Sequence, residues 1–150
     1  MSFTYPVSLR FQCVKCGICC GDTEEKTRHI ILLKTETKQI AKATLQSISG
    51  FTVRIRHKPP YTYEMKKTED GKCIFLNDNC CSIYTLRPLI CRFYPFELRM
   101  VSSQKYLFLY TSECPGLNNG PILNENYYRE LFNLACLKYR KDRDFGEKTS

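Results

Sequence analysis

The chain has 150 residues, of which 43% are hydrophobic and 10 are cysteine, and its formal net charge is +8. This length fits one domain that buries a core of its own, so cysteine need not be its main source of stability. The first residues, MSFTYPVSLRF, lack the parts of a secretory signal, and no apolar run approaches the ~18 residues of a membrane span. We therefore expect a cytoplasmic protein and no membrane partner.

A short strand and a helix are predicted first along the chain. HIILL at 29–33 is an apolar run typical of a strand. The segment 35–48 has the pattern of a helix, which Thr35 can cap and which Gly50 ends. The apolar stripe of this helix consists of Ala41, Leu45 and Ile48.

Further strands are predicted in the middle of the chain. FTVRIRH at 51–57 alternates apolar and polar residues, as a half-buried strand does, and a proline pair ends it. YTYEMKK at 61–67 and KCIFL at 72–76 can return as antiparallel strands. KYLFLYT at 105–111 has the pattern of another strand.

The last predicted element is a helix at about 124–140. One face of it is apolar and consists of Tyr128, Leu131, Phe132, Ala135 and Tyr139. The charged segment 141–150 is expected to be a frayed tail. These elements predict an α+β fold, a small single domain at 1–140 with short antiparallel strands and two main helices.

The cysteines are the most informative residues of the chain. Four of them lie within the eight residues CVKCGICC at 13–20, and six follow further on. Free exposed thiols at this density would oxidise or scramble, and disulfides do not persist in a reducing cytoplasm. We therefore favour metal ligands over a disulfide framework, and expect the domain to wrap around cysteine-ligated metal sites.

The spacing of the first cysteines is specific. A CxxC pair lets the chain wrap around one ion with backbone N–H groups turned toward the sulfurs, and Gly17 permits the positive φ that such a turn often needs. Cys13, Cys16 and Cys19 resemble the CxxCxxC run of cluster-binding ferredoxins. Neighbouring side chains of an irregular segment tend to diverge, so we expect Cys20 to serve a different centre from Cys19.

The remaining ligands are predicted from distant positions of the chain. Cys73, Cys81 and Cys91 lie at the ends of short apolar stretches, and Cys114 opens a CPG turn. Eight thiols are enough for two four-thiolate centres. The predicted ligands are Cys13, Cys16, Cys19, Cys20, Cys73, Cys81, Cys91 and Cys114. Which four share a centre stays open.

These motifs resemble the YkgJ-type cysteine-cluster family, also called the CxxCxxCC or zinc- or iron-chelating domain. The resemblance covers about 11–116. It rests on the four-cysteine run, G-x-C-x-F-L at 71–76, C-x-I-Y at 81–84, R-P-x-x-C-R-x-Y-P at 87–95, and Cys114 with Gly116. It implies metal binding at the eight cysteines and a distant relation to the cluster-bearing domain of flagellin lysine methylases. It implies no single shared reaction.

Other candidate residues have simpler interpretations. Cys80 and Cys136 fall outside these motifs, and we expect them to be structural. His29 and His57 each stand alone in apolar or alternating segments, which favours structural histidines over ligands. No residue is predicted to be catalytic.

The cofactor and the functional class have alternatives. Zinc sites typically use two separated CxxC pairs, and here only the N-terminal group has that repeat, so we favour a 4Fe-4S iron-sulfur cluster over zinc. The favoured function is a metal-binding protein with a structural, redox or sensory role. One alternative is an oxidoreductase or methyltransferase-associated enzyme that uses the cluster near a substrate pocket.

A zinc-dependent nucleic-acid binder is the other alternative. It is suggested by the basic balance and by Arg54, Arg56, Lys58, Lys66 and Lys67. The net charge of +8 counts every thiol as neutral. Two four-thiolate centres at about −2 each would lower it to roughly +4, and charges that alternate along a strand are typical of a solvated face. Nucleic acid is therefore the less favoured partner, and the sequence names no protein partner.

Overall fold

The computed structural model describes residues 1–149, with side chains through Asp144. The strands are β1 Ser2–Thr4, β2 Arg10–Phe11, β3 Ile31–Leu32, β4 Thr52–Arg54, β5 Tyr63–Met65, β6 Leu76–Asn77, β7 Cys80–Cys81, β8 Phe96–Ser102, β9 Lys105–Tyr110 and β10 Leu117–Ile122. The helices are α1 Lys34–Thr44, α2 Ile48–Phe51, α3 Leu89–Phe93 and α4 Glu125–Thr149, with 3-10 turns η1 Ile18–Cys20 and η2 Tyr84–Leu86.

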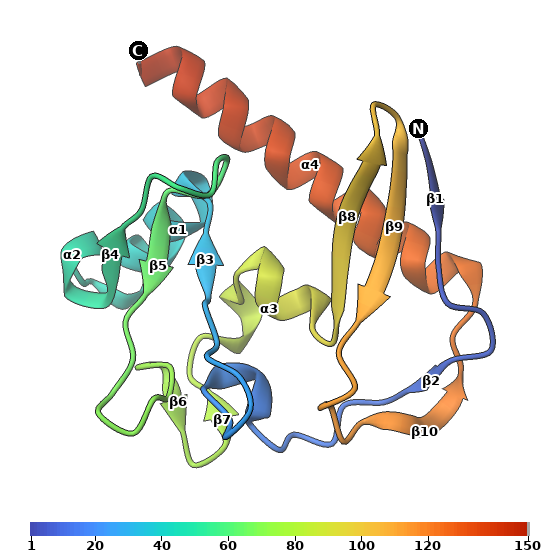
Figure 1. Cartoon of the computed structure of the whole chain (residues 1–150). Helices are drawn as coiled ribbons and strands as arrows, with labels where there is room; N and C mark the ends of the chain where they lie inside the picture. The colour runs from blue at the N-terminus through green and yellow to red at the C-terminus, as the bar shows by residue number, and fades with distance from the viewer. Residues whose placement is uncertain (150) are drawn as a thin grey trace.

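The elements form two halves on either side of α3 (Figure 1). In one half, a sheet of order β3-β5-β4 lies beside α1 and α2, and the β6–β7 hairpin lies near η1. In the other half, a sheet of order β1-β9-β8 packs against α4. The pair β2–β10 connects the base of this second half to the cysteine-rich turn.

The predicted class is confirmed, because short strands and helices mix in one small domain. The pairing is antiparallel except between β1 and β9, where Ser2 lies opposite Lys105 in parallel register. The described chain has four α-helices where two main ones were expected. The two additional helices, α2 and α3, are only four and five residues long, too short for their periodicity to be read from the sequence.

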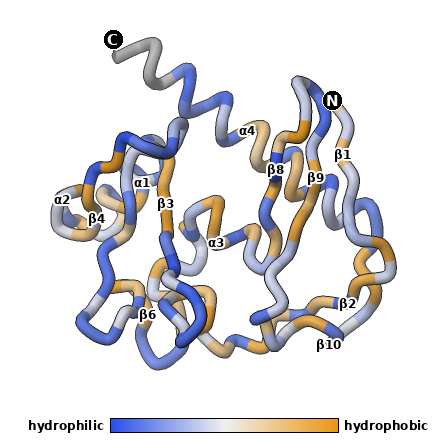
Figure 2. The backbone as a smooth tube through the Cα atoms, viewed as in Figure 1, coloured by the Kyte–Doolittle hydropathy of each residue, from blue (hydrophilic) through white to orange (hydrophobic). Residues whose placement is uncertain are grey.

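Aromatic residues of α4 and β9 form the core of the second half. The predicted apolar face is confirmed, because Tyr128, Phe132 and Ala135 are all buried. The Tyr128 ring lies 5.1 Å from that of Phe108 on β9, in edge-to-face geometry. Figure 2 shows hydrophobic segments along β9 and α4 where they face each other. The backbone of α4 runs through Thr149, whereas Ser150 and the side chains of 145–150 lie outside the described residues, so the frayed tail stays a prediction.

The first predicted helix was wrong at both ends. Leu45 has a left-handed φ of 56° and is 93% exposed, so α1 ends at Thr44, four residues before the predicted end at Ile48, and the predicted stripe is interrupted. Thr35 does not cap the helix, because its backbone N–H and its hydroxyl both bind the Asp142 carboxylate on α4. The residue at the N-cap position is Leu33.

The strands predicted from alternation are present but short, and one is absent. The segments 29–33, 51–57 and 61–67 contain β3, β4 and β5, and 105–111 contains β9. The segment 72–76 forms a turn in which only its last residue, Leu76, enters a strand. The turn arises because the backbone N–H of Leu76 binds the carbonyl of Cys73.

Glu36 is a buried carboxylate that joins three elements. Its Oε1 accepts the backbone N–H of Leu33 at 2.8 Å, and its Oε2 accepts the N–H of Leu89 at 3.0 Å. Lys138 Nζ of α4 lies 3.8 Å from Oε2. Burial raises the pKa of Glu36. Through Leu89 this carboxylate holds the start of α3, the helix that carries Cys91.

Replacing Glu36 by glutamine is expected to lower the free energy of unfolding by about 2–4 kcal/mol, because the amide nitrogen cannot accept the N–H that a carboxylate oxygen now accepts. Urea unfolding of the Glu36→Gln variant measures the loss. The matched control is Glu130→Gln at an exposed position of α4, for which a change within about 0.5 kcal/mol is expected. Equal stability of the two variants would contradict this account of Glu36.

No helix among the residues described here is both long and apolar enough to cross a membrane.

Candidate metal centre

The N-terminal cysteine run forms a tight turn around its first sulfur. The backbone N–H of Lys15 donates to Cys13 Sγ at 3.4 Å. Gly17 has a φ of 78°, which confirms the expected left-handed glycine, and its carbonyl accepts the N–H of Cys20 at 3.0 Å. This is the arrangement in which a CxxC segment directs N–H groups toward a thiolate.

Four cysteines accept a backbone N–H from the residue two positions further on. They are Cys13 from Lys15, Cys73 from Phe75, Cys81 from Ile83, and Cys114 from Gly116. Burial raises the pKa of Cys73, Cys81 and Cys114, and these N–H groups oppose that rise because they stabilise the thiolate. The N–H groups therefore offset part of the cost of ionising the thiols of Cys73, Cys81 and Cys114.

Five cysteines form what we call the inner cysteine group: Cys19, Cys20, Cys73, Cys81 and Cys91. Burial is the main cause that raises the pKa of Cys91 to about 12. Arg28 opposes this rise, and negative charge on Cys19, Cys73 and Cys81 contributes to it. Such interaction between thiolate charges requires that the sulfurs lie near one another. The group thus joins the N-terminal run to cysteines more than 50 positions away in sequence.

Backbone contacts hold the inner cysteine group together. The N–H of Cys73 donates to the carbonyl of Cys20 at 2.5 Å, and Gly21 forms an isolated bridge with Lys72. Cys81 lies on β7 opposite Leu76 of β6. Cys91 is in α3, whose first turn is closed by the bond from Cys91 N to the carbonyl of Pro88. Each ligand candidate is therefore carried by a short, bonded element.

Cys19 and Cys20 do not diverge, contrary to the expectation from their adjacency. The 3-10 turn brings their sulfurs to 4.0 Å. The bond from the Cys20 thiol, together with the positive charge of Arg28 and Arg87, lowers the pKa of Cys19 to about 6 although burial opposes it. Donating that bond raises the pKa of Cys20, and burial adds to the effect. The contact therefore shifts the pKa values of the two neighbouring thiols in opposite directions.

Three cysteines form the outer cysteine group: Cys13, Cys16 and Cys114. Burial raises the pKa of Cys114, and negative charge on Cys16 and Cys13 raises it further. The pairing of β2 with β10 brings these segments together, because the N–H of Gln12 donates to the carbonyl of Gly116 at 3.0 Å. Cys114 is buried, whereas Cys13 and Cys16 are exposed.

The predicted ligands thus fall into two groups. Within neither group do the described side chains converge on a common metal position. Within the described part of the chain, no three His, Cys, Asp or Glu side chains are arranged to hold a metal ion. The wrapping of the fold around assembled metal sites therefore stays a prediction. The donor chemistry fits, because the thiols are free, several accept N–H groups, and soft thiolates select zinc or iron-sulfur clusters.

The remaining cysteines and histidines lie apart from these groups. Cys80 is exposed on β7, and Cys136 is half-buried in α4 beside the second core. His29 Nδ1 lies 3.1 Å from Glu64 Oε2, and His57 is exposed.

Arg28 is a residue at the site that the sequence alone did not indicate. Its Nε donates to the carbonyl of Cys19 at 3.0 Å, and its guanidinium lies 5.1 Å from the centre of the Tyr94 ring. The residue is in a connector with no motif of its own, so a single sequence carries no signal for it. The candidate site therefore includes a cation in addition to the thiols.

Comparison with models of known protein families identifies the family of this chain. The model described as "CxxCxxCC: Putative zinc- or iron-chelating domain" matches residues 12–115. The chain belongs to the CxxCxxCC family. Membership confirms the resemblance in sequence and supports metal binding, without deciding between zinc and iron.

Two proteins from Methanocaldococcus jannaschii are similar in sequence to this chain. The uncharacterized protein MJ0661 is 30% identical over 145 residues, which cover 90% of this chain and 72% of that protein. The uncharacterized protein MJ0939 is 24% identical over 119 residues, which cover 76% of this chain and 39% of that protein. No solved structure matches the chain.

Proposed function

We propose that this CxxCxxCC protein is a cytoplasmic iron-sulfur protein whose main centre is held by Cys19, Cys73, Cys81 and Cys91. The proposal is carried by the bond from the Cys73 N–H to the Cys20 carbonyl, next to Cys19, and is supported by the charge of Cys19, which raises the pKa of Cys73, Cys81 and Cys91. Four thiolates are the ligand number of a 4Fe-4S cluster or of a closed zinc site. When bound, the cluster would supply an electron-accepting group and link the N-terminal turn to the 73–91 segment.

Positive charge near this centre supports the proposal. A four-thiolate cluster carries about −2 overall, and that charge needs compensation where it is partly buried. Arg28 and Arg87 both lower the pKa of Cys19, after the bond from Cys20. Arg87 is itself held over the Tyr84 ring at 3.8 Å, with its Nε bonded to the Tyr84 carbonyl at 3.0 Å. These cations are positioned to stabilise the anionic centre.

The outer cysteine group is proposed as a second metal site. It has three thiols, and the eighth motif cysteine, Cys20, interacts with the inner group instead. A metal held by three thiolates keeps one coordination position for a non-thiol ligand. Exposure of Cys13 and Cys16 leaves that position within reach of solvent or of a partner. We assign the inner centre the structural and redox role, and the outer site the exchangeable metal.

An iron-sulfur cluster is proposed over zinc because four ligand candidates come from one tight run and four from scattered single cysteines. Anaerobically purified protein is expected to be brown, to absorb near ~400 nm and to contain iron and acid-labile sulfide. Iron, sulfide and zinc counts per chain measure this. Colourless protein with two zinc equivalents would overturn the choice of cluster and leave the four-thiolate centre in place.

A nucleic-acid partner is not proposed. Of the five basic residues that suggested one, two are bound within the chain. Lys66 Nζ donates to the Ser49 carbonyl at 2.7 Å, and Lys67 Nζ lies 2.7 Å from Asp22 Oδ1. The charges of Lys66 and Lys67 therefore make contacts within the fold.

A further inference from the structure

The outer edge of the second sheet borders a cavity. The order β1-β9-β8 leaves β8 at the edge of its sheet. The cavity has a volume of about 560 Å³, and Glu97 and Leu98 of β8 line it. A smaller cavity of about 280 Å³ shares Phe96 and Glu97 with the larger one. The first residues of the edge strand therefore lie along a hollow of the molecule.

The register of β8 determines which of its backbone groups face this hollow. The N–H of Thr111 donates to the carbonyl of Pro95 at 3.0 Å, and Phe96 lies opposite Tyr110 in the same register. In an antiparallel pair, positions that bond to the partner strand alternate with positions whose backbone groups point the other way. Phe96 and Leu98 therefore direct their N–H and carbonyl groups away from β9. Among the described residues, no backbone group from another segment bonds to either of them.

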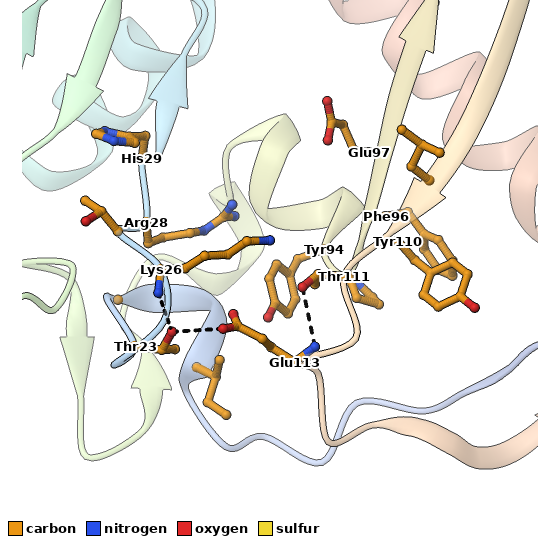
Figure 3. Close-up of a pocket in the computed structure, with 15 residues that line it drawn as sticks. Thr23, Lys26, Arg28, His29, Tyr94, Phe96, Glu97, Tyr110, Thr111 and Glu113 are labelled. Carbon is orange, nitrogen blue, oxygen red and sulfur yellow. Dashed lines mark hydrogen bonds between the residues drawn. The ribbon is translucent and has the colours of Figure 1, made fainter.

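A second sheet edge faces the same space. β3 is the outer strand of the sheet β3-β5-β4, and its Ile31 lines the larger cavity. The N–H of Met65 donates to the carbonyl of Ile30 at 2.8 Å, so the next residue, Ile31, directs its backbone groups away from β5. Figure 3 shows His29, next to β3, and Glu97, on β8, on opposite sides of the smaller cavity. Two strand edges thus border one space.

Apolar side chains line the space between the two edges. They are Leu89, Ile90 and Phe93 of α3 and Tyr139 of α4. Leu89 and Phe93 belong to the same core cluster as Phe96 of β8. The apolar layer beneath the second sheet therefore continues past its last strand, where the next strand of a wider sheet would lie.

The carboxylates that line the larger cavity have basic neighbours. Glu64 Oε2 lies 3.1 Å from His29 Nδ1, and Glu97 Oε1 lies 3.7 Å from Arg99 Nη2. Neither carboxylate requires a charged ligand. The space therefore offers an occupant backbone groups and apolar surface.

We infer that an extended segment of another polypeptide binds in this space as an added strand beside β8. Its backbone pairs with the groups of Phe96 and Leu98, and its alternate side chains contact the apolar residues of α3. Neighbouring strands lie about 5 Å apart, so one extended segment fits beside β8. A second folded copy is disfavoured, because its own helix α4 would come with its β8 and would meet the half that carries β3. The partner is thus a flexible peptide segment with alternating apolar residues.

Fluorescence polarisation tests this site, with the purified, metal-containing protein and a fluorescein-labelled hexapeptide amide of sequence TVTVTV as the probe. Leu98→Pro removes an N–H that faces the cavity and leaves the bonds to β9 in place, so it is expected to weaken peptide binding about tenfold. Met100→Pro is the matched control. It removes an N–H from the same edge beyond both cavities, and its affinity should stay within about twofold of the parent value.

Modified peptides give a second test that needs no protein variant. One version carries N-methyl groups on all its valines and the other on all its threonines, so each lacks the backbone donors along one side of the strand. Binding of the unmodified peptide and its loss with at least one methylated version supports the inference. No binding of the unmodified peptide, equal binding of all three peptides, or unchanged binding by Leu98→Pro would overturn it. A dimer in sedimentation that Leu98→Pro abolishes would also overturn it, because β8 would then pair with a second copy.

Metal content separates this inference from the proposed cluster. Leu98 lies outside both cysteine groups, so Leu98→Pro should keep the parent metal content while it loses affinity for the peptide. If the variant loses metal as well, its fold is damaged and the methylated peptides decide the question with the parent protein. The pairing uses backbone groups of β8, so a zinc protein and an iron-sulfur protein are expected to bind the peptide alike.

Discussion

Replacing Cys81 by serine is expected to remove the metal of the inner centre and to lower the free energy of unfolding by about 4 kcal/mol or more. Serine is a poor ligand for zinc or for a cluster, so one lost thiolate leaves the centre incomplete. The centre would otherwise link the N-terminal turn to the hairpin β6–β7 and to α3, so these segments would separate at lower denaturant. Metal analysis of the purified variant and chemical unfolding under anaerobic conditions measure the two effects.

Cys80 is the matched control for this experiment. It is the neighbouring residue on the same strand, but it is exposed, whereas Cys81 belongs to the inner cysteine group. Cys80→Ser is expected to keep the parent metal content and to change stability by no more than about 0.5 kcal/mol. Full metal content in Cys81→Ser, or equal loss in both variants, would show that Cys81 is not a ligand.

Replacing Gly116 by alanine is expected to destabilise the protein by about 3 kcal/mol and to empty the outer metal site selectively. A Cβ atom at this position would lie 2.5 Å from the Gln12 carbonyl oxygen and 3.0 Å from an atom of the Phe11 ring. The backbone of β2 would have to move away from β10, and Cys13 would move away from Cys114. Metal counts and thermal unfolding of Gly116→Ala measure both consequences.

Gly50 provides the comparison for the glycine substitution. It lies in α2, where an added Cβ would meet the Ser47 hydroxyl at 3.2 Å and the Gln46 side-chain oxygen at 4.0 Å, both on side chains that can rotate. Gly50→Ala is expected to be neutral or to stabilise by about 0.5–1 kcal/mol, because alanine is the better helix former. If Gly116→Ala melted like Gly50→Ala with all its metal, the β2–β10 pairing would not be what holds the outer cysteine group.

The local pattern of apolar and polar residues correctly predicted the elements whose conformation depends mainly on their own side chains. KYLFLYT became β9, and the apolar face of the last helix became the buried face of α4. The end of α1 was mispredicted because Leu45 adopts a left-handed conformation that its residue type does not favour. The start of α1 was mispredicted because Thr35 binds Asp142, which is 107 positions away in the sequence, instead of capping the helix. Contacts of that range leave no mark on local periodicity.

The candidate site was predictable in its residue types and less so in its grouping. The CxxC spacing correctly indicated the turn at Cys13 and the left-handed Gly17. It also suggested that Cys13, Cys16 and Cys19 act together, whereas Cys19 interacts with the cysteines of 73–91. Cys19 lies in the 3-10 turn that follows Gly17. The last residue of this turn, Cys20, accepts a bond from the N–H of Cys73, a contact across 53 positions that local spacing does not reveal.

Metal-edge X-ray absorption of the anaerobically purified protein tests the central claim most directly. If thiolates of the inner cysteine group hold the metal, the first shell consists of sulfur at about 2.3 Å. Cys81→Ser should lose the larger part of that signal while Cys80→Ser keeps it. A first shell of nitrogen or oxygen at about 2.0–2.2 Å would contradict the account.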